Sequence, residues 1–555
     1  MGRVVCIGLD GGTFDLIDPW AEAGHLPALR EVIRGGARAP LRSVILPFTP
    51  QAWTSFLTGV NPGIHGIFGF KEMKKGTYGF QFVNNKSIRV KTLPTLLTEL
   101  NKNVILVNIP MTYPPEPVNG VLISGMDAPG TESDFVYPPE LRKEVFEVSP
   151  GYTVHLHIGA GYLDSDRKRR AGIRGLLQMV ENRERVVLHF LKNHTWDFFA
   201  VNFAAIDQVQ HHFWRYLRED GEFHDAVLKV YRRVDETVGK ILCELDGETT
   251  LIVMSDHGAG PASEWVFFID EWLREKGYLH FTSRSSLRRA LNHTARFVLS
   301  TLSKKLSSDT KDHLMKRFPG LRITSQGFIR RSLIDWGKTK VFSGEHPSTL
   351  RINLKSREPH GTVTPGREER QVCDRLTREL EELAIPGTDE RLIERVYRRE
   401  ELYHGPHTGL APDLVVLAKD FSHQFRGGSY PPGLGYGAVI SKKNHREFFV
   451  NGVHRLDGIL LAHGPKIVSG VDLREPLSIM DIFPTVLFAL GLEVPLGLDG
   501  KVPNALFEES FLGRNPVRYR ECDLTRIRTD EARSYETAEE SRKIEEALRG
   551  LGYLD

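Results

Sequence analysis

Long apolar runs, cysteine pairs and an excess of one charge are all missing from this sequence of 555 residues. No stretch reaches the roughly 18 consecutive apolar residues of a transmembrane helix. The four cysteines are scattered and form no Cys-x-x-Cys pair, which argues against a disulfide framework and a thiolate zinc site. The 73 Lys+Arg nearly balance the 71 Asp+Glu, so nothing indicates specific nucleic-acid binding. The first residues read as a core strand rather than a secretion signal, and we expect a cytoplasmic protein.

Short apolar runs that end in polar or glycine-containing loops are frequent. Most are continuous rather than alternating, as is typical of strands buried on both faces of a sheet. Helical patterns such as 177–192 and 223–245 lie between them. This alternation predicts an α/β fold with a large, mostly parallel central sheet flanked by helices. In such sheets ligands bind at the carboxyl ends of the strands. The predicted strands are 4–9, 104–109, 121–124, 197–202, 250–254, 413–417 and 458–461.

The chain divides by composition into four parts. Residues 1–281 and 341–508 are expected to form the catalytic α/β core, interrupted by a basic helical insertion at 282–340 that serves as a lid or cap. Between Arg284 and Arg331 there are twelve Lys/Arg and two Asp/Glu. This charge fits a solvated face, or attraction of an anionic substrate or a membrane surface through 282–336. Residues 509–555 are predicted to be a helical extension.

Two segments near the start of the chain carry candidate chemistry. Asp10 ends the first predicted strand and is followed by two glycines, which also fits an ordinary turn. Thr49 stands where a helix N-cap would, with Pro50 at the first helical position. A capping threonine is the simplest interpretation. A helix N-terminus also favours negative charge, so a threonine alkoxide or a phosphoryl group would be stabilised there.

Two further segments have metal-ligand spacing. Asp207 and His211 are four residues apart after a predicted strand, and on a helix they would share one face. Asp256 and His257 follow another predicted strand directly, and both can reach one ion if the backbone turns sharply at Gly258. This Ser-Asp-His-Gly segment is the most specific single motif of the sequence.

A fifth segment offers either His454 or His463 as a ligand, and the residues alone do not distinguish them. Asp10, Asp207 and Asp256 would together bring three carboxylates close, which raises their pKa values in the absence of cations. Two divalent ions would neutralise them together with a threonine alkoxide and would polarise a phosphate ester. Mixed His/Asp ligation suits zinc, with manganese or iron as alternatives.

These five segments, in this order, resemble the type I phosphodiesterase/nucleotide pyrophosphatase family of the alkaline phosphatase superfamily. The resemblance implies an alkaline-phosphatase-like sandwich and a hydrolase that uses two metal ions and a small phosphorylated substrate. Other matching segments are 58–67, 351–354, 357–359, 411–414, 481–485 and 498–500. By this resemblance Thr49 is the nucleophile and forms a phospho-threonine, and His454 is favoured over His463. One metal is then held by Asp207, His211 and His454, and the other by Asp10, Thr49, Asp256 and His257.

The sequence departs from the family at one substrate contact. Eukaryotic members have an asparagine that helps to hold a phosphate oxygen, and Phe70 stands at that position here. Asn84, Asn85 or Lys86 could replace it. A phosphomonoesterase, a phosphonate hydrolase and a phospho-head-group transferase are the alternatives within the superfamily. A monoesterase needs an additional cation, for which Arg455 is the candidate. A non-catalytic binding protein is the remaining alternative, and the oligomeric state is left open.

Overall fold

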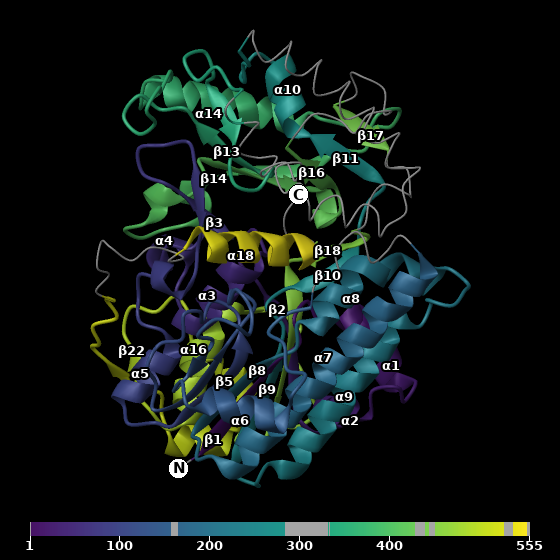
Figure 1. The fold of residues 1–555 in the computed structure, drawn as a ribbon. Helices are drawn as coiled ribbons and strands as arrows, with labels where there is room; N and C mark the ends of the chain where they lie inside the picture. Colours follow the sequence, from purple (N-terminus) through teal and green to yellow (C-terminus); the bar gives the residue numbers. More distant parts are fainter. Residues whose placement is uncertain are drawn as a thin grey trace.

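The computed structural model describes residues 2–156, 165–282, 331, 333–427, 439–442, 450–526 and 537–551. It is built around a ten-stranded sheet whose five central strands all run parallel (Figure 1). This confirms the predicted α/β sandwich. In order across the sheet, the strands are β20 (Val471–Asp472), β2 (Ala37–Arg42), β19 (Asp457–His463), β9 (Thr249–Met254), β1 (Arg3–Gly8), β8 (Phe198–Asn202), β5 (Val104–Ile109), β6 (Gly120–Ser124) and β7 (Val136–Tyr137), while β21 (Leu477–Ser478) pairs with β2.

Helices cover both faces of this sheet because its central strands are apolar on both sides. In β1, Val5 and Ile7 belong to one hydrophobic cluster and Val4 and Cys6 to the other. The first face packs against α1 (Phe14–Glu22), α2 (Pro27–Gly35), α6 (Leu141–Val148), α7 (Asp166–Asn193), α8 (Ala205–Phe213) and α9 (Ala226–Glu244). The second packs against α3 (Thr49–Thr58), α5 (Leu93–Glu99) and α16 (Ile482–Ala489).

A smaller unit with its own hydrophobic cluster lies beyond one end of the large sheet (Figure 1). It includes the predicted strand 413–417, which belongs to a separate antiparallel sheet and not to the central one. Its elements are β12 (Val341–Ser343), β13 (Thr349–Ile352), β15 (Leu414–Ala418), β14 (Ile393–Arg398), β16 (Gln424–Arg426), β11 (Trp265–Phe268), β17 (Ile440–Lys442), α10 (Ile269–Glu275) and α14 (Arg367–Glu381).

Shorter elements complete the described chain. They are β10 (Gly258–Pro261) with β18 (Gly452–Arg455), β3 (Lys71–Met73) with β4 (Phe80–Phe82), β22 (Val494–Pro495) with β23 (Tyr519–Arg520), α4 (Pro62–His65), α15 (Arg399–Leu402), α17 (Glu509–Arg514) and α18 (Ala538–Leu551). The C-terminal extension is thus helical in α17 and α18, with β23 between them. Most of the basic insertion, 283–330, lies outside the described residues. No helix within the described ranges combines the length and apolar character that crossing a membrane requires.

Candidate active site

Asp10 is placed by the carboxyl end of β1 and by the turn that follows it. Gly11 has a φ of 67°, and a Cβ on it would lie 3.1 Å from Oδ1 of Asp207. The glycine therefore lets the Asp10 turn approach helix α8 closely. Asn202, at the end of neighbouring strand β8, donates a hydrogen bond of 2.8 Å to Oδ2 of Asp10. The turn thus brings two carboxylates together at the predicted edge of the sheet.

Helix α8 presents Asp207 and His211 from one face, as their spacing predicts. His211 Nε2 lies 3.2 Å from Asp207 Oδ1. His454 reaches the same point from β18, with its Nε2 3.0 Å from His211 Nε2 and 3.5 Å from Asp207 Oδ1. Three potential ligand atoms from two separate elements therefore converge on one position.

The end of β9 supplies the other half of the cluster. His257 Nε2 lies 3.4 Å from Asp256 Oδ2 and 3.9 Å from Asp10 Oδ1. Its ring stacks on that of His454, with centroids 3.6 Å apart. Asp10, Asp207 and His257 form a second group of convergent ligand atoms that shares Asp207 with the first.

Gly258 has a different role from the predicted one. Its φ is not positive, so it makes no left-handed turn, and it begins strand β10. A Cβ on Gly258 would lie 2.1 Å from the carbonyl oxygen of Asp457. The glycine is needed for close approach of two backbones, which brings β18 and His454 next to His257.

All three histidines are oriented by backbone carbonyls. In each, Nδ1 lies at hydrogen-bond distance from a carbonyl oxygen, which fixes the proton on Nδ1 and leaves Nε2 facing the cluster. These contacts are His211 to Gly452 at 2.8 Å, His454 to Pro47 at 2.7 Å and His257 to Gly258 at 2.9 Å. Neutral imidazoles with this orientation are competent metal ligands.

Thr49 begins helix α3 but does not cap it. The N-cap is Phe48, and no side chain makes the capping hydrogen bond, so the predicted capping interaction is wrong. The Thr49 side chain is completely buried, and its Oγ1 has no hydrogen-bond partner among the described residues. One helical turn later, Trp53 packs against Gly8 at the end of β1. The start of α3 therefore lies near the same end of β1 as Asp10.

Several buried polar atoms of the cluster lack a partner within the described parts of the chain. Such atoms are rare in folded proteins because leaving them unpaired is costly. Carboxylate oxygens and imidazole nitrogens are the donor set that zinc and similar divalent ions prefer. The residues present therefore fit a metal centre. Within the cluster the unpaired atoms are Asp10 Oδ1, Asp256 Oδ2 and His257 Nε2. Thr49 Oγ1 is unpaired as well, and it lies two residues after Pro47, whose carbonyl oxygen is 2.7 Å from His454 Nδ1.

The pKa values of the three carboxylates also indicate that the cluster is suited to cations. Burial, followed by the charge of Asp207, raises the pKa of Asp10 to about 7. Burial and the charge of Asp10 raise the pKa of Asp256 well above its usual value. Burial also acts to raise the pKa of Asp207, but His211 and His454 together hold it well below its usual range. Without cations the three carboxylates cannot all remain charged at neutral pH.

The structure distinguishes between His454 and His463, the two candidate ligands of the fifth segment. Strand β19 runs antiparallel to β9, with Leu460 opposite Met254 and His463 opposite Leu251. His463 therefore lies toward the amino end of β9, away from Asp256 at its carboxyl end. His454 lies in the cluster.

Three of the four predicted substrate contacts make hydrogen bonds within the protein, namely Asn84, Asn85 and Arg455. Asn84 Oδ1 accepts from the Lys86 amide at 3.0 Å and so holds its own turn, whereas Asn85 Nδ2 donates to the Pro114 carbonyl at 3.0 Å and joins two separate segments. The Arg455 guanidinium donates to backbone carbonyls, at 2.7 Å for Pro261 and 3.1 Å for His454. It ties β18 to β10. Contact of these residues with a substrate stays a prediction.

Two residues near Asp10 were missed by the sequence reasoning. Asn202 ends a predicted strand, and that position was the signal that could have identified it. Arg183 on α7 is buried and donates a 2.8 Å hydrogen bond to the Asn202 carbonyl. Burial lowers the pKa of its guanidinium, although Tyr152 and Asp10 offset part of this effect. Nothing in the local sequence marks Arg183, because its partners come from other segments.

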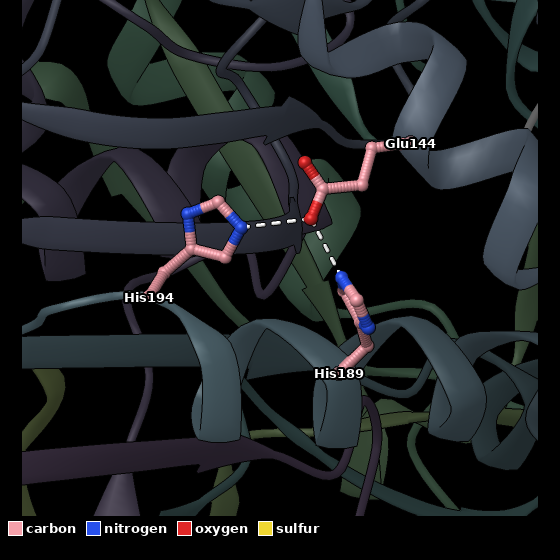
Figure 2. Close-up of side chains that lie close together, drawn as sticks. All are labelled: Glu144, His189 and His194. Atoms are coloured by element: carbon pink, nitrogen blue, oxygen red, sulfur yellow. Dashed lines mark hydrogen bonds and ion pairs between the residues drawn. The ribbon is translucent and has the colours of Figure 1, made fainter.

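A third cluster of potential ligands lies near the opposite end of β8. Figure 2 shows the His189 and His194 rings directed at one oxygen of Glu144, with Nε2 atoms 2.6 Å and 2.9 Å away. The Asn193 amide nitrogen lies 3.2 Å from Nδ1 of His189, which favours a proton on Nε2 of that ring. The cluster therefore fits a carboxylate that accepts two hydrogen bonds and joins α6 to the end of α7.

A comparison with protein families assigns the chain to one of them. The model of the type I phosphodiesterase/nucleotide pyrophosphatase family matches residues 4–431. The chain belongs to this family. It is therefore a hydrolase of the phosphodiester and pyrophosphate class. The matched region contains Asp10, Thr49 and the candidate ligands on α8 and after β9, whereas His454 lies beyond its end.

Solved structures of this family share the fold. Murine ectonucleotide pyrophosphatase/phosphodiesterase 5, in an inactive form in complex with AMP, is 13% identical with a TM-score of 0.51. The match covers 92% of this chain and all of that one. A second structure of the murine protein is 14% identical with a TM-score of 0.50, and the match covers 91% of this chain and all of that one. Comparison with curated protein sequences gives no significant match.

Proposed function

We propose that this family member is a metal-dependent phosphodiesterase or pyrophosphatase with Thr49 as its nucleophile. The observation that carries the proposal is the set of buried, unpaired atoms at the carboxyl edge of the sheet. One ion would be held by Asp207, His211 and His454, and the other by Asp10, Asp256, His257 and Thr49. Zinc suits these ligands best, with manganese or iron as alternatives. When bound, the ions would supply Lewis-acid stabilisation of the charges on phosphorus and on the two reacting oxygens.

The proposed reaction consists of two successive displacements at phosphorus. In the first, Thr49 Oγ1 bonds to phosphorus and the bond to the first leaving oxygen breaks, so that an alcohol or phosphate departs with the proton that Thr49 gives up. In the second, water attacks the same phosphorus and the bond to Thr49 breaks. Asn202 holds the Asp10 carboxylate in place through both steps. The start of α3 provides backbone N–H groups of the kind that stabilise a phosphoryl group.

The substrate is proposed to be a small phosphorylated molecule. A murine relative binds AMP, which favours a nucleotide-sized ester. Phe70 stands where eukaryotic family members have an asparagine, and its side chain cannot hold a phosphate oxygen. Arg455, the cation expected for a monoesterase, is bonded to backbone carbonyls. These observations favour a diester over a monoester, because a diester carries one charge fewer on its phosphate.

Hydrolysis of two chromogenic esters tests this proposal. The metal-loaded protein is given bis-p-nitrophenyl phosphate and p-nitrophenyl phosphate, with and without a chelator. We expect faster cleavage of the diester, and loss of that activity on chelation with recovery on addition of zinc or manganese. A preference for the monoester would instead indicate a phosphomonoesterase. A folded, metal-loaded protein that cleaves neither ester would contradict the hydrolase proposal for these substrates.

A further inference from the structure

A loop of the smaller unit reaches the residues next to Thr49. It joins β12 to β13. Glu345 Oε1, on this loop, accepts a hydrogen bond of 2.7 Å from the backbone amide of Phe70, which lines one small void with Thr49. The ring of His346 packs against that of Phe48, with centroids 4.8 Å apart. Two consecutive residues of the smaller unit therefore contact the residue before the proposed nucleophile and the residue that stands where eukaryotic family members have an asparagine.

The ring of His346 carries its proton on Nε2. Its Nδ1 accepts a hydrogen bond of 3.1 Å from the backbone amide of Ser348, and the Ser348 hydroxyl lies 2.6 Å from the same atom. A ring nitrogen that accepts a hydrogen bond holds no proton, so in the neutral ring the proton is on the other nitrogen. Burial, followed by the charges of Arg426 and His454, lowers the pKa of His346 to about 3. The ring is therefore neutral at physiological pH and presents one N–H donor.

The position of His346 relative to the candidate active site follows from three consecutive residues. His454 Nδ1 lies 2.7 Å from the carbonyl oxygen of Pro47, and the His346 ring packs on Phe48, the next residue. Thr49 follows directly. The side chain of His346 is half-buried, and its Nε2 makes no hydrogen bond with any residue that the structure describes. The N–H group of His346 is therefore available to a ligand at the segment that connects His454 to Thr49.

A neutral N–H donor suits the phosphate group of a diester. The non-bridging oxygens carry the charge of the phosphoryl group during displacement. A fixed donor directed at such an oxygen contributes about 10²- to 10³-fold in rate. The side chain of Phe70 has no donor, whereas an imidazole N–H is neutral like the amide N–H of an asparagine. His346 therefore offers the kind of contact that Phe70 does not.

We propose that His346 is a catalytic residue that donates a hydrogen bond from Nε2 to a non-bridging oxygen of the substrate phosphoryl group. The inference rests on the proposed function and adds to it a substrate contact from the smaller unit. Ser348 fixes the ring so that Nε2 is the donor. Glu345 holds the loop against the backbone of Phe70.

Three substitutions at His346 test this contact on the full-length, metal-loaded protein, with bis-p-nitrophenyl phosphate as substrate. We expect His346→Ala to lower kcat/KM by about 100-fold, with zinc content and Tm near those of the wild type. The amide nitrogen of a glutamine reaches the position of Nε2, so His346→Gln should retain activity within about tenfold of the wild type. The shorter His346→Asn places its amide nitrogen only at the position of Nδ1 and should lose as much activity as His346→Ala. His360→Ala, which removes an exposed histidine of the same unit, should leave kcat/KM unchanged.

Sulfur in place of one non-bridging oxygen gives a readout that a merely structural role would not change. The two stereoisomers of p-nitrophenyl methyl phosphorothioate place the sulfur at one or the other non-bridging position. Sulfur is a weak hydrogen-bond acceptor, so His346 should contribute less to cleavage of the isomer whose sulfur occupies the contacted position. We expect the ratio of kcat/KM between the isomers to change by about tenfold in His346→Ala.

Several results would overturn the contact and leave the proposed function standing. They are wild-type activity in His346→Ala, and an equal loss of activity on both phosphorothioate isomers. A His346→Asn protein as active as His346→Gln would overturn it too, and that comparison remains valid if His346→Ala does not fold. A metal-loaded wild type that cleaves no diester would instead remove the proposed function, and this inference with it.

Discussion

At the scale of single residues, the candidate active site contains buried carboxylates that repel one another and polar groups that partly offset this repulsion. Asp10, Asp207 and Asp256 are all buried within one cluster. Neighbouring carboxylates raise one another's pKa. Among the described residues, His211 and His454 oppose this at Asp207, and the hydrogen bond from Asn202 opposes it at Asp10. A buried group whose charge is not compensated lowers the stability of the fold. The arrangement of the carboxylates thus suits bound cations and lowers the stability of the metal-free protein.

Replacing one carboxylate should therefore stabilise the metal-free protein. Asp256→Asn removes a charge while the amide oxygen can still accept from the Gly11 N–H, as Asp256 Oδ1 does at 3.3 Å. We expect the free energy of unfolding at pH 8, measured by urea denaturation with a chelator present, to rise by about 1–2 kcal/mol. The variant should bind less zinc than the wild type. Asp457→Asn, which breaks an exposed pair with Arg42, should change stability by less than about 1 kcal/mol. A metal-free Asp256→Asn protein that is less stable than the wild type would contradict the account.

At the scale of elements, the hydrogen bonds of Glu144 with His189 and His194 join α6 to the end of α7 (Figure 2). Burial tends to raise the pKa of Glu144, but its hydrogen bonds with His194 and His189 outweigh burial and lower the pKa below its usual 4.5. A carboxyl group with a lowered folded-state pKa stabilises the protein above its unfolded-state pKa. That stabilisation is lost as the pH falls through the folded-state value.

The variant Glu144→Gln should therefore be less stable than the wild type by up to about 1 kcal/mol at pH 7. The difference should shrink as the pH falls from 4.5 through the lowered folded-state pKa of Glu144, because the carboxyl group then becomes protonated. Urea denaturation at pH 7 and at pH 3.5 measures both values. Glu147→Gln is the matched control, because Glu147 pairs with Lys143 on the exposed side of the same helix. Equal destabilisation at both pH values would show that the charge of Glu144 contributes nothing.

The elements that the sequence predicts well are those with strong local patterns. Continuous apolar runs located β1, β5, β8 and β9, and the spacing of Asp207 and His211 placed both on α8. The strand at 413–417 has the same local pattern but pairs in the separate sheet, because pairing depends on distant partners. The capping role of Thr49 was wrong for a similar reason. A threonine before a proline is a capping signal, and only the packed structure shows that its hydroxyl is buried without a partner among the described residues.

Contacts between distant segments could not be predicted. The position of α18 against Thr49 depends on the burial of Ile544 and Leu548 against Phe70, Phe82 and Met126, which lie more than 400 residues earlier in the chain. The sequence of a charged, amphipathic terminal helix does not indicate which surface of the protein the helix will cover. The predicted division of the chain at 282–340 stays a prediction, since 283–330 lies outside the described residues.

At the scale of the whole molecule, the proposed ions would join segments from the two ends of the chain. Asp10 follows the first strand, and His454 lies on β18, far along the sequence. Ligands that bind only the folded state stabilise it by about 4 kcal/mol at a thousandfold excess over Kd. We therefore expect removal of the metal to lower the Tm, and zinc to restore it. Calorimetry with and without a chelator measures this shift, and the shift should be smaller in His211→Ala. An unchanged Tm on chelation would argue against a metal centre that bridges these elements.

The measurement that tests the account most directly is hydrolysis of bis-p-nitrophenyl phosphate by Thr49→Ala. The account predicts that kcat/KM falls by more than about a thousandfold. Zinc content and Tm should stay near those of the wild type, because Asp10, Asp256 and His257 would still hold the second ion. Thr54→Ala, which removes another buried hydroxyl from the same helix, should retain most of the activity. A Thr49→Ala protein that still hydrolyses the diester at a rate near that of the wild type would contradict the assignment of Thr49 as the nucleophile.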